Sequence, residues 1–247
     1  MARVITVAGQ KGGIGKTFTS LTIAIYISQV LKKKTLYIPL DNQGKASKRV
    51  LNLKDGLVVN GMFYNEPYDI QKVDEHLDSL CSDRTIHNLD RADFAEAKAF
   101  ADEVNRIKSN YEFVVVDTPP GLGTRITAAI LAADKIVCPV EAEITSIDGL
   151  IELRDTVRKL VRFNPKARIN SIIVNKYKDV DDQKDIRDQL IAMFPNEVHP
   201  TPIKDLQPIK TAMSQGRMVW QNAKNGNQRV AAKLVKSVIS EIIEGKL

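Results

Sequence analysis

A glycine-rich loop between an apolar strand and an amphipathic helix is the feature that most restricts how this chain folds. Residues 3–8 (RVITVA) predict a buried β-strand, residues 9–17 (GQKGGIGKT) follow it, and residues 17–32 predict a helix. Gly12, Gly13 and Gly15 allow the backbone to turn tightly and to direct its N–H groups toward an anion. Strand, loop and helix together predict a phosphate-binding loop, or P-loop.

The side chains of this loop have the chemistry that a nucleotide and a metal ion require. Lys16 is expected to reach the β- and γ-phosphates, and the Thr17 hydroxyl is expected to bind Mg²⁺. The loop and the first helical residue supply the predicted phosphate contacts, which are Lys11, Gly12, Gly13, Ile14, Gly15, Lys16, Thr17 and Phe18.

Beyond the P-loop, apolar segments rich in Val and Ile alternate with longer amphipathic segments. Strands are predicted at residues 35–38, 113–116, 135–140 and 169–174, and helices at 92–108, 124–133, 147–162, 181–193 and 227–243. This alternation predicts an α/β fold of the P-loop NTPase type: one domain over residues 1–247, with a mostly parallel twisted sheet and helices on both faces. Residues 44–75 give no clear pattern, and the later pattern is interrupted by Pro200, Pro202 and Pro208.

Cysteine usage and hydropathy restrict the class of protein further. Cys81 and Cys138 lie far apart in no metal-binding pattern, so they are expected to be ordinary reduced thiols. The sequence shows no signal peptide and no apolar run of ~18 residues, the length that a membrane-spanning helix needs. These features predict a soluble cytoplasmic protein with no integral membrane contact.

Positive charge is concentrated in the last part of the chain. Residues 1–150 contain 18 Lys and Arg against 19 Asp and Glu, a net charge of −1, whereas residues 151–247 contain 18 against 11, a net charge of +7. Such an excess suits a polyanion such as nucleic acid, and it also suits a solvated surface. Charge alone favours the solvated surface.

The P-loop and two further segments resemble those of one ATPase family. The form KGGxGKT, with Lys11 ahead of Gly12, resembles the deviant P-loop of the ParA/MinD family. Residues 111–123 (YEFVVVDTPPGLG) resemble the family's Walker B segment and place Asp117 after four apolar residues. Residues 36–47 (LYIPLDNQGKAS) resemble its second motif, and the matching residues are Asp41, Gln43, Gly44, Ala46 and Ser47.

The resemblance implies ATP and Mg²⁺ as cofactors and gives roles to particular residues. Lys11, Lys16 and Asp41 are the implied catalytic residues: Lys11 would reach the phosphates bound by a partner subunit, and Asp41 would orient the attacking water. Thr17, Asp41 and Asp117 form the implied metal side of the site, with Asp117 acting through a water molecule.

A second implied group of residues surrounds the adenine base. Asn175 follows the strand predicted at residues 169–174 and resembles the family's adenine-contacting Asn. The segment 201–205 would flank the base, which adds Pro202, Ile203 and Asp205 to the predicted nucleotide contacts.

At two positions the sequence departs from the family pattern. Pro39 stands where the second motif usually has its first Asp, and Phe18 stands where a hydroxyl residue usually follows the P-loop. Loss of an outer carboxylate reduces metal affinity or activity by ~10–100-fold in other metal sites. The sequence therefore predicts tight ATP binding and slow hydrolysis.

Within the family, the chain resembles the short ParA type. This resemblance implies a homodimer formed on ATP binding, non-specific DNA binding on the nucleoid, a ParB-like adaptor that stimulates hydrolysis, and a role in plasmid or chromosome partition. No operator-reading domain is expected ahead of the P-loop. The candidate DNA contacts are Lys176, Lys178, Lys204, Lys210, Arg217, Lys224, Arg229, Lys233 and Lys236.

Two related functions remain as alternatives. A ParA-like protein that positions a cargo other than DNA would have a similar sequence. A MinD-like regulator would bind membranes through a basic amphipathic C-terminal helix. Residues 233–247 (KLVKSVISEIIEGKL) lack an aromatic anchor, so their apolar stripe is expected to pack on the core.

Overall fold

All the strands of the described residues form one twisted sheet. The computed structural model describes residues 2–41 and 45–245. In this part of the chain the sheet has seven strands in the order β3-β4-β2-β5-β1-β6-β7. The strands are β1 (Arg3–Val7), β2 (Thr35–Pro39), β3 (Ile70–Lys72), β4 (Leu77–Leu80), β5 (Phe113–Asp117), β6 (Lys135–Glu141) and β7 (Ile169–Asn175). Every pairing is parallel except β3 with β4 at one edge.

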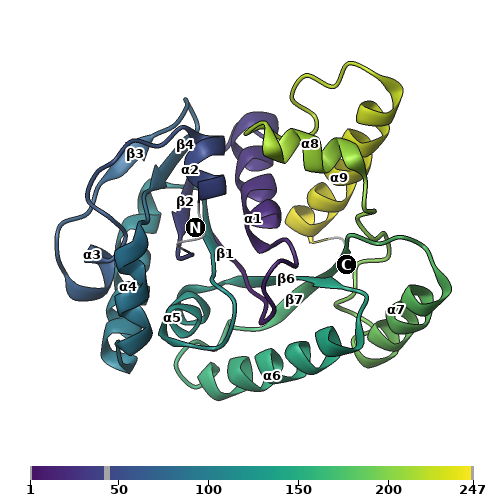
Figure 1. The fold of residues 1–247 in the computed structure, drawn as a ribbon. Helices are drawn as coiled ribbons and strands as arrows, with labels where there is room; N and C mark the ends of the chain where they lie inside the picture. Colours follow the sequence, from purple (N-terminus) through teal and green to yellow (C-terminus); the bar gives the residue numbers. More distant parts are fainter. Residues whose placement is uncertain (1, 42–44, 246–247) are drawn as a thin grey trace.

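Helices cover both faces of this sheet (Figure 1). The longer helices are α1 (Lys16–Ile25), α4 (Phe94–Ile107), α5 (Thr124–Ala132), α6 (Ile144–Leu160), α7 (Asp181–Met193), α8 (Gln207–Ser214) and α9 (Gly226–Glu244). The shorter helical segments are η1 (Tyr26–Val30), α2 (Lys45–Leu51), α3 (Gly61–Tyr64), η2 (Arg84–Arg91) and η3 (Lys108–Asn110). None of the helices within the described ranges is both long and apolar enough to cross a bilayer.

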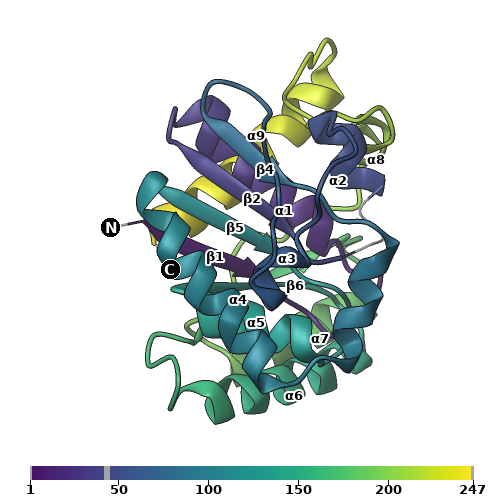
Figure 2. The ribbon, with the colours of Figure 1, turned by 90° about the vertical axis from the view of Figure 1, so that its left-hand side faces the viewer.

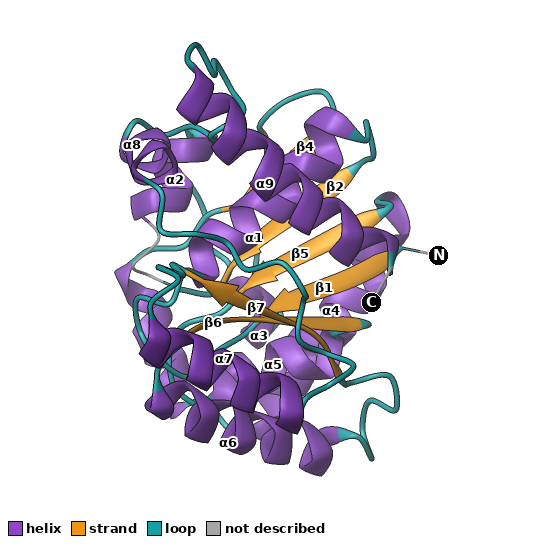
Figure 3. Cartoon of the chain, turned by 90° about the vertical axis from the view of Figure 1, so that its right-hand side faces the viewer, coloured by secondary structure: helices purple, strands orange, loops and turns teal. Residues whose placement is uncertain are grey.

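One face of the sheet packs against α4, α5, α6 and α7, and the opposite face packs against α1, α8 and α9 (Figures 2 and 3). Because residues alternate along a strand, neighbouring side chains of β1 enter different layers. Val4 belongs to the cluster under α4 to α6, while Ile5 belongs to the cluster under α1 and α9. Strands buried on both faces explain why the sequence shows continuous Val and Ile runs.

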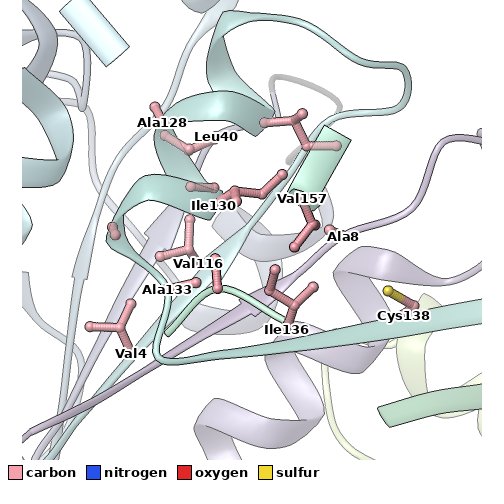
Figure 4. Close-up of a cluster of buried hydrophobic side chains, with 14 of the residues drawn as sticks. Val4, Ala8, Leu40, Val116, Ala128, Ile130, Ala133, Ile136, Cys138 and Val157 are labelled. Carbon is pink, nitrogen blue, oxygen red and sulfur yellow. The ribbon is translucent and has the colours of Figure 1, made fainter. Parts of the chain in front are cut away.

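Figure 4 shows part of the first cluster, in which Ala128 of α5 lies near Leu40 and Ile130 of α5 lies near Val116 of β5. These side chains are 0% exposed, so removing any of them leaves a cavity in a close-packed layer. The layer fixes the carboxyl ends of β1, β2 and β5, from which the functional loops start.

The predicted fold class is confirmed, and the five predicted strands and six predicted helices occur within a few residues of their expected positions. The sequence did not reveal α2, α3, β3, β4, η2 and α8. Pro208 lies in the first turn of α8 and does not end the ordered pattern, because proline lacks an N–H that the first turn would leave unpaired anyway. The predicted matches Gln43 and Gly44 lie outside the described residues.

Both cysteines, Cys81 and Cys138, are free and buried. Burial raises the pKa of the Cys138 thiol to about 12, so it remains protonated at neutral pH.

Candidate nucleotide site

The P-loop lies at the centre of the sheet, where β1 ends between β5 and β6. A loop at this point opens at the carboxyl ends of the strands, where open α/β sheets bind their ligands. Gly13 and Gly15 have φ angles of +81° and +96°, which favour glycine. A Cβ on Gly15 would also lie 2.2 Å from Nδ2 of Asn175. The loop therefore requires glycine at position 15 for both conformation and space.

Six of the eight predicted phosphate contacts line a single cavity of about 430 Å³, whereas Lys11 and Ile14 line a neighbouring one. This phosphate cavity is lined by Gly12, Gly13, Gly15, Lys16, Thr17, Phe18, Asp41 and Pro120. The cavity brings together predicted residues of the P-loop and Asp41, which follows β2. Pro120, which follows β5, was part of a quoted motif but was not predicted as a contact.

Lys16 is 5% exposed although it carries an ammonium group. Its Nζ donates a hydrogen bond to the carbonyl oxygen of Lys11 at 2.8 Å. Burial lowers the pKa of Lys16, and the nearby carboxylates of Asp117 and Asp41 partly oppose this shift. A cation held in this way can contact phosphate oxygens with little loss of hydration, since most of its water is already displaced.

Asp117 ends β5 near Thr17, which lines the phosphate cavity, and it is 1% exposed. Burial raises the pKa of Asp117 to about 7; the Asp41 carboxylate adds to this shift, whereas the nearby hydroxyls of Thr17, Tyr37 and Ser20 oppose it. Asp117 Oδ1 has no hydrogen-bond partner in the described part of the chain. A buried carboxylate oxygen beside a threonine hydroxyl fits a hydrated Mg²⁺, which prefers oxygen ligands and keeps several waters.

Asp41 comes two residues after β2 ends and is 7% exposed. Two hydrogen bonds fix the backbone around it: Arg125 Nη1 donates to the carbonyl oxygen of Leu40 at 3.0 Å, and Ser82 Oγ donates to that of Asp41 at 3.1 Å. The Arg125 guanidinium, itself 5% exposed, also pairs with Asp90 at 2.7 Å. No sequence pattern predicted a buried arginine at this position.

Lys11 points away from the phosphate cavity, unlike Lys16. Its Nζ forms an ion pair with Glu143, just before α6, and both side chains are nearly half exposed. The hydrogen bond that Lys11 donates to Glu143 is the main cause that raises the pKa of Lys11. Gln10, the preceding residue, bonds to Glu152 of α6. Lys11 therefore lies at the surface beside α6, where a second molecule can reach it.

The predicted adenine contacts lie around a neighbouring cavity of about 210 Å³. Of these residues, Asn175, Ile203 and Asp205 line this cavity, called the base cavity below, whereas Pro202 does not. Nδ2 of Asn175 donates to the carbonyl oxygen of Ile14 at 2.8 Å, which joins the end of β7 to the P-loop. The unpredicted α8 completes the apolar wall with Ile209 and Met213.

Several lysines that were candidate DNA contacts have partners in or beside this site. Lys176 donates to the carbonyl oxygen of Gly13 at 2.7 Å and to Glu141 at 2.8 Å. Lys210 pairs with Asp205 at 2.6 Å, and Lys204 lies 3.9 Å from Asp179. Lys176 and Lys210 thus help to build the nucleotide site.

Two residues missed by the sequence analysis contact the metal side of the site. The Tyr37 hydroxyl donates to Asp117 Oδ2 at 3.1 Å and lies 3.1 Å from Ser20 Oγ. Burial, followed by the charge of Asp117, raises the pKa of Tyr37, so its hydroxyl remains a donor at neutral pH. The available signal was a single polar aromatic residue in the otherwise apolar strand TLYIP.

Comparison with known proteins gives the same family as the motifs. A family model described as an AAA domain (AAA_31) matches residues 2–169. The chromosome-partitioning ATPase Soj of Thermus thermophilus is 31% identical, over 90% of this chain and 88% of Soj. Protein IncC of Escherichia coli is 27% identical over 94% of this chain, which spans 66% of IncC.

Solved structures share the fold. An ATP complex of Cyanothece McdA has a TM-score of 0.86 at 17% identity, covering 99% of this chain and 96% of that chain. Structures with this fold have been solved with ATP and with ADP and magnesium. The chain therefore belongs to the ParA/MinD family of P-loop ATPases, enzymes that act on ATP with Mg²⁺.

Proposed function

We propose that this protein is a DNA-partitioning ATPase whose ATP-bound form is a dimer that binds DNA without sequence preference. The observation that carries the proposal is the different direction of the two P-loop lysines. Lys16 is buried beside its own phosphate cavity, and Lys11 is exposed at the surface beside α6. One lysine can thus bind the nucleotide of its own subunit while the other reaches the nucleotide of a second copy.

In the proposed ATP complex, the P-loop amides and Lys16 bind the phosphates. Thr17 and Asp117 hold Mg²⁺, with Asp117 acting through a metal-bound water, and Asp41 orients the water that attacks the γ-phosphate. The buried Oδ1 of Asp117 and the position of Asp41 at the edge of the phosphate cavity support these assignments. The metal supplies charge neutralisation for phosphoryl transfer.

In the dimer, Lys11 exchanges Glu143 for the phosphates bound by the partner subunit. An exposed ion pair contributes little to stability, so this exchange costs little. A second cation near the γ-phosphate stabilises the charge that develops during phosphoryl transfer. Dimerisation then couples ATP binding to hydrolysis, which a ParB-like adaptor accelerates.

The base cavity supports adenine binding between α8 and the end of β7. Asn175, Ile203 and Asp205 line it, and Pro202 flanks the same segment without reaching the cavity. Phe18 lines both this cavity and the phosphate cavity, so it lies between the base and phosphate regions. We propose that its backbone N–H replaces the contact that a hydroxyl residue would make.

A basic groove along α9 is the proposed DNA contact. Arg229, Lys233 and Lys236 line this α9 groove, of about 500 Å³, together with Tyr26 and Trp220. Among the described residues these three basic side chains have no acidic partner, in contrast to Lys176, Lys204 and Lys210. Residues four and seven positions apart on a helix share a face, which places their charges in one row.

A charge-reversal experiment tests the DNA proposal. Binding of a random-sequence duplex is measured without nucleotide, with ADP, with ATP and with a non-hydrolysable ATP analogue, at two salt concentrations. We expect binding only with ATP or the analogue, and a steep decrease with salt because phosphate contacts release counterions. Lys233→Glu with Lys236→Glu is expected to weaken binding by at least ~10-fold.

The matched control carries the same charge change on the opposite face of the sheet, as Lys159→Glu with Arg162→Glu at the end of α6. It is expected to keep most of the DNA affinity. Equal losses in both variants would contradict the α9 groove, and absence of DNA binding in every nucleotide state would contradict the DNA function. Binding to anionic vesicles instead of DNA would indicate a membrane-associated regulator.

A further inference from the structure

The carboxylate assigned to the metal is in contact with a completely buried phenol. Tyr37 Oη donates to Asp117 Oδ2 at 3.1 Å, and Ser20 Oγ lies 3.1 Å from the same Oη. Tyr37 is 0% exposed, so water does not compete for these bonds. The phenol gives its one proton to Asp117, and Ser20 Oγ, which donates to the carbonyl oxygen of Thr17 at 3.1 Å, is the second polar neighbour of the phenol oxygen.

The strand register explains why Tyr37 makes this contact. Asp117 is paired across the sheet with Pro39, and Tyr37 is paired with Val115. Side chains at positions 37 and 39 project from the same face of β2, about 6.6 Å apart along the strand. The phenol ring spans this distance, whereas Pro39 has no polar atom with which to bond the carboxylate.

The contact restricts Asp117 in a way that matters for a metal ion. Oδ2 is occupied by the Tyr37 hydroxyl, and Oδ1 is buried without a hydrogen-bond partner among the described residues. A carboxylate held by one oxygen cannot rotate freely about its last bond. Its other oxygen keeps one direction, as outer hydrogen bonds do for metal ligands elsewhere.

We propose that Tyr37 is a positioning residue for magnesium: its hydroxyl holds Asp117 so that Oδ1 is presented to the metal and its waters. The proposal rests on the assignment of Asp117 to the metal under the proposed function. Tyr37 lies in the segment 36–47 but is not one of the residues that match the second motif, and it gives the chain a group that holds Asp117 at a site where Pro39 supplies none.

Tyr37→Phe tests the proposal because it removes the hydroxyl and keeps the ring. The measurement is binding of a fluorescent ATP analogue during a Mg²⁺ titration, together with binding of the same analogue in EDTA. We expect the Mg²⁺ concentration at half-saturation to rise by about 10-fold. Binding in EDTA is expected to stay within about twofold of wild type, since Lys16 and the P-loop are unchanged.

Tyr111→Phe is the matched control. Tyr111 Oη donates to Asp78 Oδ2 at 3.0 Å, so this variant loses the same kind of bond. The bond lies at the start of β5, about 20 Å from Asp117 along the strand. We expect Tyr111→Phe to leave the Mg²⁺ dependence unchanged, which separates a general loss of stability from an effect on the metal.

Ser20→Ala provides a second variant, which keeps the proposal testable if Tyr37→Phe folds poorly. It removes the second polar neighbour of the phenol oxygen, and we expect a smaller rise of about twofold to threefold in the Mg²⁺ requirement. A Mg²⁺ dependence equal to wild type in both variants would overturn the role of Tyr37. If the wild-type protein bound the ATP analogue with the same affinity at every Mg²⁺ concentration and in EDTA, the metal assignment would be overturned, and with it this inference.

Discussion

The floor and the rim of the nucleotide site use similar polar groups under very different conditions. The floor consists of Ser20, Tyr37 and Asp117, which are at most 1% exposed. The rim consists of Lys11 and Glu143, whose side chains are 44% and 45% exposed, together with the Gln10–Glu152 pair. Burial strengthens hydrogen bonds and makes an unpaired group costly, whereas water screens the rim.

This difference separates the part of the site whose geometry is fixed from the part whose contacts a partner can replace. In the floor, each group is held by neighbours from β2, β5 and α1, so its geometry is fixed before ligands bind. In the rim, the contacts are exposed ion pairs and hydrogen bonds, which contribute little and can be replaced by a partner. The floor suits metal and phosphate binding, and the rim suits contact with a second molecule.

The largest expected effect comes from the buried cation next to the floor. Lys16→Gln is expected to reduce ATP affinity and hydrolysis by at least ~100-fold, because it removes a desolvated positive charge from the phosphates. Calorimetric titration with ATP and Mg²⁺ checks this, with the exposed Lys98→Gln of α4 as control. An affinity within threefold of wild type would mean that the P-loop lysine is not needed here.

Arg125→Met tests whether a buried hydrogen bond stabilises the backbone next to Asp41. The substitution removes the donor to the Leu40 carbonyl and leaves Asp90 without its partner. We expect the free energy of unfolding to fall by about 1–3 kcal/mol, since a buried acceptor becomes unsatisfied. Chemical denaturation measures the loss, and Arg158→Met, which removes an exposed pair with Asp155, is expected to cause none that is measurable.

The pH dependence of Mg²⁺ binding tests the raised pKa of Asp117 in the floor. The pKa of Asp117 is raised to about 7, so ionising this carboxylate without a metal reduces stability as pH rises from about 4 to 7. Mg²⁺ must displace the proton below this pKa. We therefore expect Mg²⁺ affinity to fall by up to about 10-fold per pH unit below 7. A flat dependence between pH 5.5 and 8 would contradict the raised pKa.

The smallest expected effect is at the rim. Glu143→Gln removes the partner of Lys11, and we expect the melting temperature to change by less than about 2 °C because the pair is exposed to water. Differential scanning calorimetry measures it. A decrease of more than about 5 °C would show that the Lys11–Glu143 pair contributes strongly to stability, which would contradict the difference between rim and floor.

The sequence predicted the parts of the site that local patterns determine. Glycines and Lys16 identify the P-loop, and Asp117 is predicted at a strand end because four apolar residues precede it. Apolar runs and amphipathic segments, alternating along the chain, were also sufficient to predict most of the sheet and the main helices. These features depend on residues that are close together in the chain.

The features that were missed depend on distant segments meeting in space. The contact of Tyr37 with Asp117 spans 80 positions, and that of Arg125 with the Leu40 carbonyl spans 85. The short segments α2, β3 and β4 have too few residues for a periodicity to emerge. The partners of Lys176 and Lys210 likewise became visible only when β7 and α8 were placed beside the P-loop.

The most direct test of the account asks whether the two P-loop lysines serve different subunits. Lys11→Ala is compared with wild type by ATP-binding titration and by sedimentation velocity with a non-hydrolysable ATP analogue. We predict that Lys11→Ala binds the nucleotide within about threefold of wild type and remains monomeric, while wild type dimerises. A variant that dimerises as well as wild type, or one that loses nucleotide binding as a monomer, would contradict the division between floor and rim.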